Sequence, residues 1–304
     1  MKKKILIILV ITLLMGGCEL KLKNSKKHYR IMTSDFTAYD FTRSITKGSE
    51  AINVEMLVKP GSDLHHFKLS SKNIDDIKKS DMFIYNGSEK DPWLKDVLAS
   101  IDSEKTEVIR LMDFVKVKEI NFKDSDDVID DEHIWTSPKK AKTLVKYLKR
   151  EIIKTTKHID ALKLTDNTNK YLKELDDLDT DLTNLVKYAS RKVIAVAGNF
   201  PFIYLTEDYG LKFYTLNNLC NDNKKMDEEK INELINKINE EKIPVVFYTD
   251  ISDISTAERI ANLTKTKALE LHSAHNIAIN DFDKGITYID IMKKNIKALE
   301  EALK

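Results

Sequence analysis

The sequence predicts an α/β protein of two lobes, each a mostly parallel sheet flanked by helices, joined by one long rigid helix. In the first half of the chain, short apolar runs alternate with helical patterns, which is typical of a parallel sheet covered by helices. A second series of the same kind fills the last third. Between them, leucines recur at helical spacing in a stretch that contains no Gly or Pro.

The first lobe is expected to span residues 28–165. Its helices are predicted at two places: over residues 70–80, near a serine cap, and from Pro138 after a cap at Ser137. The predicted strands are residues 29–34, 52–58, 82–87 and 107–111. The apolar stripe that the second helix should bury consists of Ala141, Leu144, Val145, Leu148 and Ile152.

The linking helix is predicted over residues 166–190 from the spacing of its leucines, Leu172, Leu175, Leu178, Leu182 and Leu185. A helix of about 25 residues runs about 37 Å, which is the width of a small domain. The alternative is a coiled coil, but two to three heptads are too few to favour it. We therefore interpret this segment as a strut between the lobes.

The second lobe is expected to span residues 191–304. Helices are predicted at 227–241, at 255–265 and, as a final amphipathic helix, at 288–303. The predicted strands are residues 192–198, 211–216, 243–250 and 267–273.

The first 27 residues are expected to lie outside the fold. Residues 1–18 combine a basic start, an apolar run at 5–14 that is too short to span a bilayer, and small residues before Cys18. This pattern resembles the lipobox of bacterial lipoproteins, in which the cysteine is lipidated; an ordinary secretory signal is the alternative. Residues 19–27 are polar and lysine-rich, as expected for a tether. We therefore predict a lipid anchor at the outer face of the cytoplasmic membrane.

The charge balance and the cysteine count limit which binding partners and cross-links the sequence can support. The chain has 50 Lys and Arg against 49 Asp and Glu, so its net charge gives no argument for binding nucleic acid. After Cys18 only Cys220 remains, which rules out a disulfide within the mature chain. We expect an exported globular monomer.

Five of the seven histidines are predicted on loops at strand ends. His65 and His66 follow the second strand, His133 precedes the helix that begins at Pro138, and His272 and His275 close the last strand. Ligands of α/β sheets bind beyond the carboxyl ends of the strands, and imidazole is a good zinc ligand. No HExxH, GxSxG or glycine-rich phosphate loop accompanies these histidines. The pattern therefore favours holding a divalent metal over catalysis, and no enzyme activity is expected.

Three stretches, "PGSDLHHF", "SDMFIYNGSEKDPWL" and "DEHIWTSP", resemble motifs of the metal-specific (zinc/manganese) substrate-binding lipoproteins of ABC importers. The resemblance extends over nearly the whole mature chain. It implies metal ligands at His65, rather than its neighbour His66, and at His133. It also implies an ABC permease as partner.

The chain departs from that family at the third ligand position, where Asn199 stands and can offer only a weak carbonyl oxygen. The family's final acidic ligand falls on His272, with His275 as the close second choice. A nitrogen-rich site favours zinc, whereas the asparagine keeps Mn²⁺ or Fe²⁺ as alternatives. A surface zinc hydrolase with an open water position and a surface adhesin are the rival functions. Trp93 and Trp135 are expected to pack in the cleft wall.

Overall fold

The computed structural model describes residues 27–62, 66–87, 91–121, 128–217, 227–250 and 252–304. It confirms two α/β lobes. The first contains a four-stranded sheet in the order β2-β1-β3-β4, and all its pairings are parallel. Its strands are β1 (Tyr29–Thr33), β2 (Ile52–Met56), β3 (Met82–Tyr85) and β4 (Glu107–Arg110), so all four strand predictions are confirmed.

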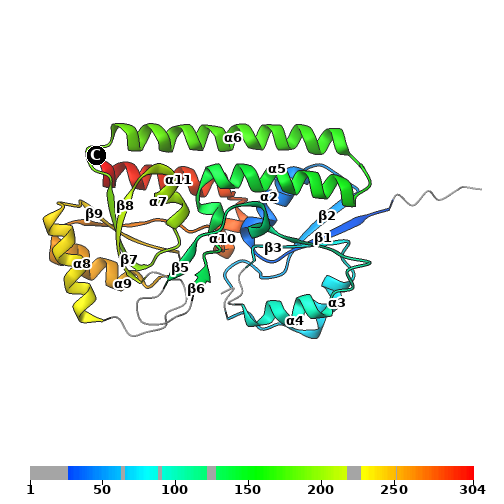
Figure 1. Ribbon diagram of the computed structural model, residues 1–304, viewed down its shortest axis with the longest axis horizontal. Coiled ribbons are helices and arrows are strands. Elements are labelled where there is room, and N and C mark those ends of the chain that lie inside the picture. Colours follow the sequence, from blue (N-terminus) through cyan, green and yellow to red (C-terminus); the bar gives the residue numbers. More distant parts are fainter. Residues whose placement is uncertain (1–26, 63–65, 88–90, 122–127, 218–226, 251) are drawn as a thin grey trace, which may run out of the picture.

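Helices cover both faces of this sheet, because alternate residues of each strand point to opposite sides. Ile31 and Ile84 belong to one buried cluster, whereas Met32 and Phe83 belong to another. In Figure 1 α2 and α5 lie on one side of the sheet, with α3 and α4 on the other. The bounds are α2 (Phe36–Thr46), α3 (Ser71–Lys78), α4 (Pro92–Ser100) and α5 (Pro138–Thr155).

Several short elements were not predicted, α2 and α4 among them. After β4 the chain forms a short 3₁₀ helix, an antiparallel pair of strands and a second 3₁₀ turn before α5. These elements are η1 (Leu111–Phe114), β5 (Glu119–Asn121), β6 (Val128–Asp130) and η2 (Ile134–Thr136). His133, a predicted metal ligand, lies between β6 and η2.

The second lobe repeats the parallel plan, with strand order β10-β9-β7-β8. Its predicted strands are confirmed as β7 (Val193–Asn199), β8 (Lys212–Asn217), β9 (Val245–Tyr248) and β10 (Lys267–Glu270). Its helices are α7 (Ile203–Tyr209), α8 (Glu228–Glu240), α9 (Ile254–Thr264), α10 (Ile279–Asp283) and α11 (Tyr288–Leu303).

The two lobes share one hydrophobic core. A single buried cluster includes Ile31 and Ile84 of the first sheet, Val196 and Phe247 of the second, and Leu178 of the long helix. A separate cluster under α8 and α9 fills the outer face of the second sheet. Because apolar contacts run without a break from one sheet to the other, separating the lobes would expose this core to water.

The long helix α6 extends over Ala161–Tyr188 and begins five residues earlier than predicted. Lys157, His158 and Asp160 have positive φ, so a left-handed turn ends α5 and starts α6. The helix α6 packs against α5, α2 and α11 along its length and bridges both lobes (Figure 1). It therefore works as part of the shared core as well as a strut.

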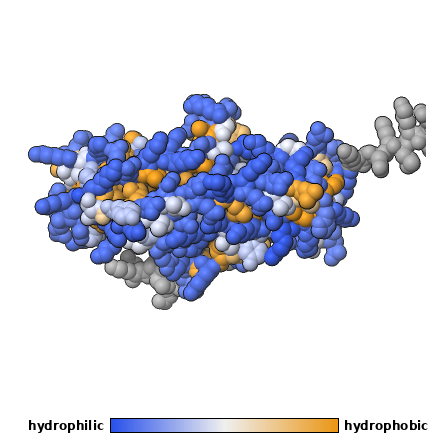
Figure 2. Space-filling model, turned by 90° about the horizontal axis from the view of Figure 1, so that it is seen from above, coloured by the Kyte–Doolittle hydropathy of each residue, from blue (hydrophilic) through white to orange (hydrophobic). Residues whose placement is uncertain are grey.

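The surface is mainly hydrophilic in the view from above, with separate small hydrophobic areas (Figure 2). None of the helices formed by the described residues has both the length and the apolar character needed to cross a bilayer. The predicted signal segment, residues 1–18, lies outside the described residues.

A buried carboxylate joins three of the packed helices. Asp40 of α2 accepts hydrogen bonds from the Tyr288 backbone N–H at 3.1 Å, from the Tyr171 hydroxyl at 3.2 Å and from Arg43 at 2.9 Å. Burial raises the pKa of Asp40, and Arg43 opposes that shift. The side chain thus holds α2, α6 and the start of α11 together.

We predict that Asp40→Ala lowers the free energy of unfolding by about 2–5 kcal/mol. The Tyr171 hydroxyl and the Tyr288 N–H would be left buried without their acceptor, and each such group costs about 1–3 kcal/mol. Urea denaturation measures the change. The matched control is Asp177→Ala on α6, whose side chain is 61% exposed; it should change stability by less than about 0.5 kcal/mol. Equal losses for both variants would contradict the role given to Asp40.

Candidate metal centre

His133 lies between β6 and α5 and is held by a carboxylate two residues earlier. The Asp131 Oδ1 atom is 2.7 Å from the His133 backbone nitrogen and 2.8 Å from ring Nδ1. Because an ionised carboxylate can only accept, Nδ1 carries the ring proton and the lone pair of the neutral ring lies on Nε2. A carboxylate that orients a histidine in this way is the usual partner of a metal-binding imidazole.

The second lobe braces this arrangement through Tyr204 of α7. Its hydroxyl donates to the Asp131 carbonyl at 2.7 Å and accepts the Lys118 N–H at 2.9 Å. Burial raises the pKa of Tyr204, so the hydroxyl stays protonated and keeps its donor role. The backbone that carries His133 is therefore fixed from both lobes.

His275, after β10, packs against His133. The two ring centroids are 5.2 Å apart and the rings are nearly perpendicular, at 88°. Both are buried, with 5% of His133 and 2% of His275 exposed. The indole of Trp135 contacts both imidazoles, with centroids 5.4 and 5.5 Å away. One histidine from each lobe thus meets in a single buried contact.

Hydrogen bonds from the first lobe fix the segment that carries His275. The Trp135 indole N–H donates to the Ser273 carbonyl at 2.8 Å, and the Thr37 hydroxyl donates to the Ala274 carbonyl. On the other side, the Ser273 backbone N–H donates to Asp250 at the end of β9 at 2.6 Å. The segment is therefore bonded to both lobes at successive residues.

His272 is bonded to its own loop. Its Nδ1 accepts the backbone N–H of Ala274 at 2.9 Å, which places the proton of a neutral ring on Nε2. Asp250 Oδ1 is 3.5 Å from the same Nδ1, too far for a hydrogen bond, and already accepts the Ser273 N–H. In this conformation neither ring nitrogen of His272 offers a lone pair to a metal.

Two further residues of the predicted motifs, Asn199 and His66, lie within the described chain. Asn199 ends β7, where its side-chain oxygen is 3.4 Å from the Asn217 amide nitrogen, and His66 is exposed. His65, Cys18 and Cys220 lie outside the described residues. Within the residues that the structure describes, no three His, Cys, Asp or Glu side chains gather into a metal-binding cluster. Of the candidate metal ligands in the described chain, His133 and His275 are the two that the structure brings into contact.

Trp135, one of the two tryptophans expected in the cleft wall, contacts the histidine pair. The ring of Trp93 lies 5.4 Å from that of Phe67 in an edge-on contact.

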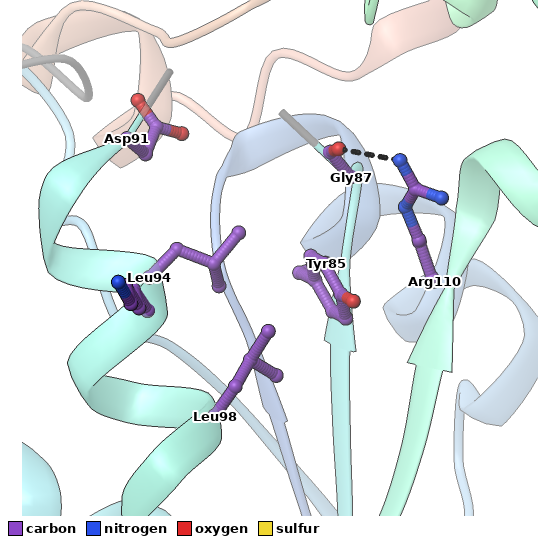
Figure 3. Close-up of a pocket in the computed structure, with 7 residues that line it drawn as sticks. Tyr85, Gly87, Asp91, Leu94, Leu98 and Arg110 are labelled. Carbon is purple, nitrogen blue, oxygen red and sulfur yellow. Dashed lines mark hydrogen bonds between the residues drawn. The ribbon is translucent and has the colours of Figure 1, made fainter. Parts of the chain in front are cut away.

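A cavity of about 400 Å³ lies between β3 and α4 (Figure 3). Arg110 donates to the Gly87 carbonyl at 3.1 Å across its mouth. Gly87 has φ +125°, a conformation that favours glycine, and a Cβ there would lie 2.7 Å from Met112 Sδ and 2.8 Å from Arg110 Nε. The described residues that line this cavity are Tyr85, Gly87, Asp91, Leu94, Lys95, Leu98 and Arg110. These residues include no imidazole or thiol, so they do not add to the nitrogen-rich site.

Comparison with known proteins matches this architecture. The sequence profile of the family described as "Zinc-uptake complex component A periplasmic" (ZnuA) matches residues 31–302. The chain belongs to this family. Family membership confirms the resemblance predicted from the three sequence motifs.

Individual relatives are distant in sequence but cover most of this chain. The high-affinity zinc uptake system protein ZnuA of Bacillus subtilis is 24% identical over 290 residues, which are 92% of this chain and 89% of that protein. The zinc-binding lipoprotein AdcA of Streptococcus pneumoniae is 25% identical over 92% of this chain, which spans only 56% of AdcA.

The solved Zn(II)-bound ZnuA-like domain of S. pneumoniae AdcA superposes with a TM-score of 0.76 at 24% identity. The match covers 91% of this chain and 99% of that one. It confirms the two-lobed fold.

Proposed function

We propose that this protein captures a zinc ion outside the cell, holds it between the two lobes and delivers it to the membrane permease of an ABC importer. The observation that carries the proposal is the buried pair of His133 and His275. Two imidazoles that bind one tetrahedral zinc at ~2.0–2.1 Å have ring centroids about 5 Å apart. The separation here is 5.2 Å.

His275, rather than His272, is the ligand proposed from the second lobe. This reverses the order that the position of the family's acidic ligand suggested. The ring of His275 contacts that of His133, whereas Nδ1 of His272 accepts a backbone N–H. A metal ligand needs a nitrogen lone pair, which the hydrogen bond to His272 already uses.

His65 is proposed as a further ligand. The Gly61 N–H donates to the Ile277 carbonyl at 2.8 Å, so the chain four residues before His65 touches the segment that follows His275. Four residues reach at most about 14 Å, a span long enough for His65 to join the pair in the proposed site. Asn199 is proposed to add at most a weak oxygen.

The ligand chemistry favours zinc over manganese. Imidazole nitrogens suit zinc, whereas manganese prefers carboxylate, carbonyl and water oxygens. The burial of both histidines also supports zinc binding for transport rather than a hydrolase activity, because a zinc hydrolase keeps one metal position open to water. We therefore propose no catalytic role.

The ligand assignment predicts unequal effects of three alanine variants. His133→Ala and His275→Ala should each lose several kcal/mol of the ~10–16 kcal/mol typical of zinc sites, whereas His272→Ala should lose little. Titration calorimetry of the full chain with zinc, and with manganese for comparison, measures this. The assignment is wrong if His272→Ala weakens zinc binding as much as His275→Ala does. A wild-type chain that binds neither metal would refute the proposed function.

Zinc affinity should fall as the pH drops, because an imidazole must lose its proton to bind metal. Below about pH 6.5, the usual pKa of histidine, two such ligands should raise the Kd up to about 100-fold for each pH unit. Zinc titrations between pH 7.5 and 5.5 measure the slope. A Kd that stays constant over this range would rule out histidine ligands.

The anchor is proposed on Cys18, supported by the resemblance to a lipobox and by a relative that is named a lipoprotein. The mature protein should begin at Cys18 and carry the added mass of its acyl chains. Intact-mass measurement of the membrane-extracted protein tests this, with Cys18→Ala as the control. A mature N-terminus at any other residue would contradict the anchor.

A further inference from the structure

Two loops from opposite lobes are bonded directly beside the histidine pair. On the first lobe, residues 59–62 follow β2 and contain the turn at Gly61. On the second, Asn276 and Ile277 follow His275. The Gly61 N–H donates to the Ile277 carbonyl, and the Asn276 side-chain amide donates to the Ser62 carbonyl. We call these two hydrogen bonds the strap.

The Asn276 amide has a fixed orientation. Its Oδ1 accepts the backbone N–H of Ile277 at 2.7 Å, which leaves the NH₂ group facing the first lobe. There it lies beside the Ser62 carbonyl and 3.4 Å from the Lys59 carbonyl. An asparagine amide can make both kinds of bond, accepting the Ile277 N–H and donating to the first lobe, because it carries an acceptor and donors on one short side chain.

Gly61 permits the close approach of the two loops. Its φ of +75° lies in the left-handed region, where glycine is unstrained. A Cβ at this position would lie 3.1 Å from Cγ1 of Ile279. Alanine here would therefore strain the backbone and would need the Ile279 side chain to shift by a few tenths of an ångström.

The position of the strap gives it a consequence for the metal. Asn276 is the residue after His275, and Ser62 stands three residues before His65. The Ser273 and Ala274 carbonyls, on the other side of His275, already accept hydrogen bonds from Trp135 and Thr37 of the first lobe. With the strap, the first lobe bonds the chain both before and after His275.

We propose that Asn276 is a positioning residue that keeps the ligands of the two lobes in one register, and this inference rests on the proposed zinc-binding function. The side chain does not touch the metal. It sets the distance between the two loops, so that the ligand set is formed before zinc arrives. Loss of the strap should therefore speed zinc release more than it slows zinc capture.

The test compares two strap variants with two matched controls in the full chain. Asn276→Ala removes the amide, and Gly61→Ala adds backbone strain together with the contact to Ile279. Asn280→Ala removes an exposed asparagine of α10, and Gly48→Ala has the same kind of strain at φ +71° with no atom within 4 Å of the added Cβ. Zinc titration gives the affinity, stopped-flow transfer to a chelating dye gives the release rate, and thermal unfolding gives the apo melting temperature.

We expect both strap variants to bind zinc roughly ten- to hundredfold more weakly, as for other residues that orient metal ligands. The release rate should rise by about the same factor, with the apo melting temperature of Asn276→Ala unchanged. Both controls should match the wild type. Release from Asn276→Ala at the wild-type rate would overturn the inference. So would a loss of affinity that appears only together with a lower apo melting temperature, because it would assign the bond to folding. A wild-type chain that binds no zinc instead refutes the proposed function.

Discussion

The structure depends on the buried hydrogen bond between the Trp135 indole and the Ser273 carbonyl. A buried indole N–H requires an acceptor, and here the acceptor comes from the other lobe. The Tyr288 hydroxyl donates to the Trp135 carbonyl at 2.6 Å, so the start of α11 is bound to the same point. Opening this junction would leave several polar groups buried without partners, at about 1–3 kcal/mol each. The segment that bears His275 is therefore bonded to the first lobe as well as to the second, to which its sequence belongs.

The shared core imposes the same constraint on a larger scale. One apolar cluster runs from the first sheet through α6 to the second sheet. A wide hinge movement would break this cluster, whereas small shifts of surface loops leave it intact. The zinc capture and release proposed for this protein would therefore need movements of the loops around the histidine pair only. The long helix predicted from the leucine spacing contributes to this constraint, because it packs against α2, α5 and α11.

The sequence predicted what depends on local pattern. Alternating apolar runs located all eight strands of the two parallel sheets, and the leucine spacing located the long helix. The predicted start of α6 was wrong. The true start depends on residues with left-handed backbone conformation in the preceding turn, and no glycine in the sequence marks that turn. The helix α2 was missed because it begins directly after β1, and its threonines are weak helix formers.

At the site, the strand-end loops predicted from the sequence include the two that bring His133 and His275 into contact, but strand-end placement could not rank His272 against His275. That ranking depends on Ala274, whose φ of +57° brings its N–H to the His272 ring. A non-glycine residue in this conformation is strained, and it persists because the bonds on both sides hold it there. Asp131 was also missed as the partner of His133, although the spacing of an acid two residues before a histidine was visible in the acidic run.

The bracing of the two histidines bears on which metal the site accepts. Tyr204 of the second lobe holds the backbone of Asp131 and thereby His133, while Trp135 of the first lobe holds the segment of His275. Each imidazole is thus supported by the lobe to which it does not belong. The ring centroids of the pair are 5.2 Å apart, which suits the proposed tetrahedral site. Manganese and calcium prefer a larger number of oxygen ligands. In the proposed site, the contacts that keep the lobes together would therefore favour zinc by geometry as well as by ligand type.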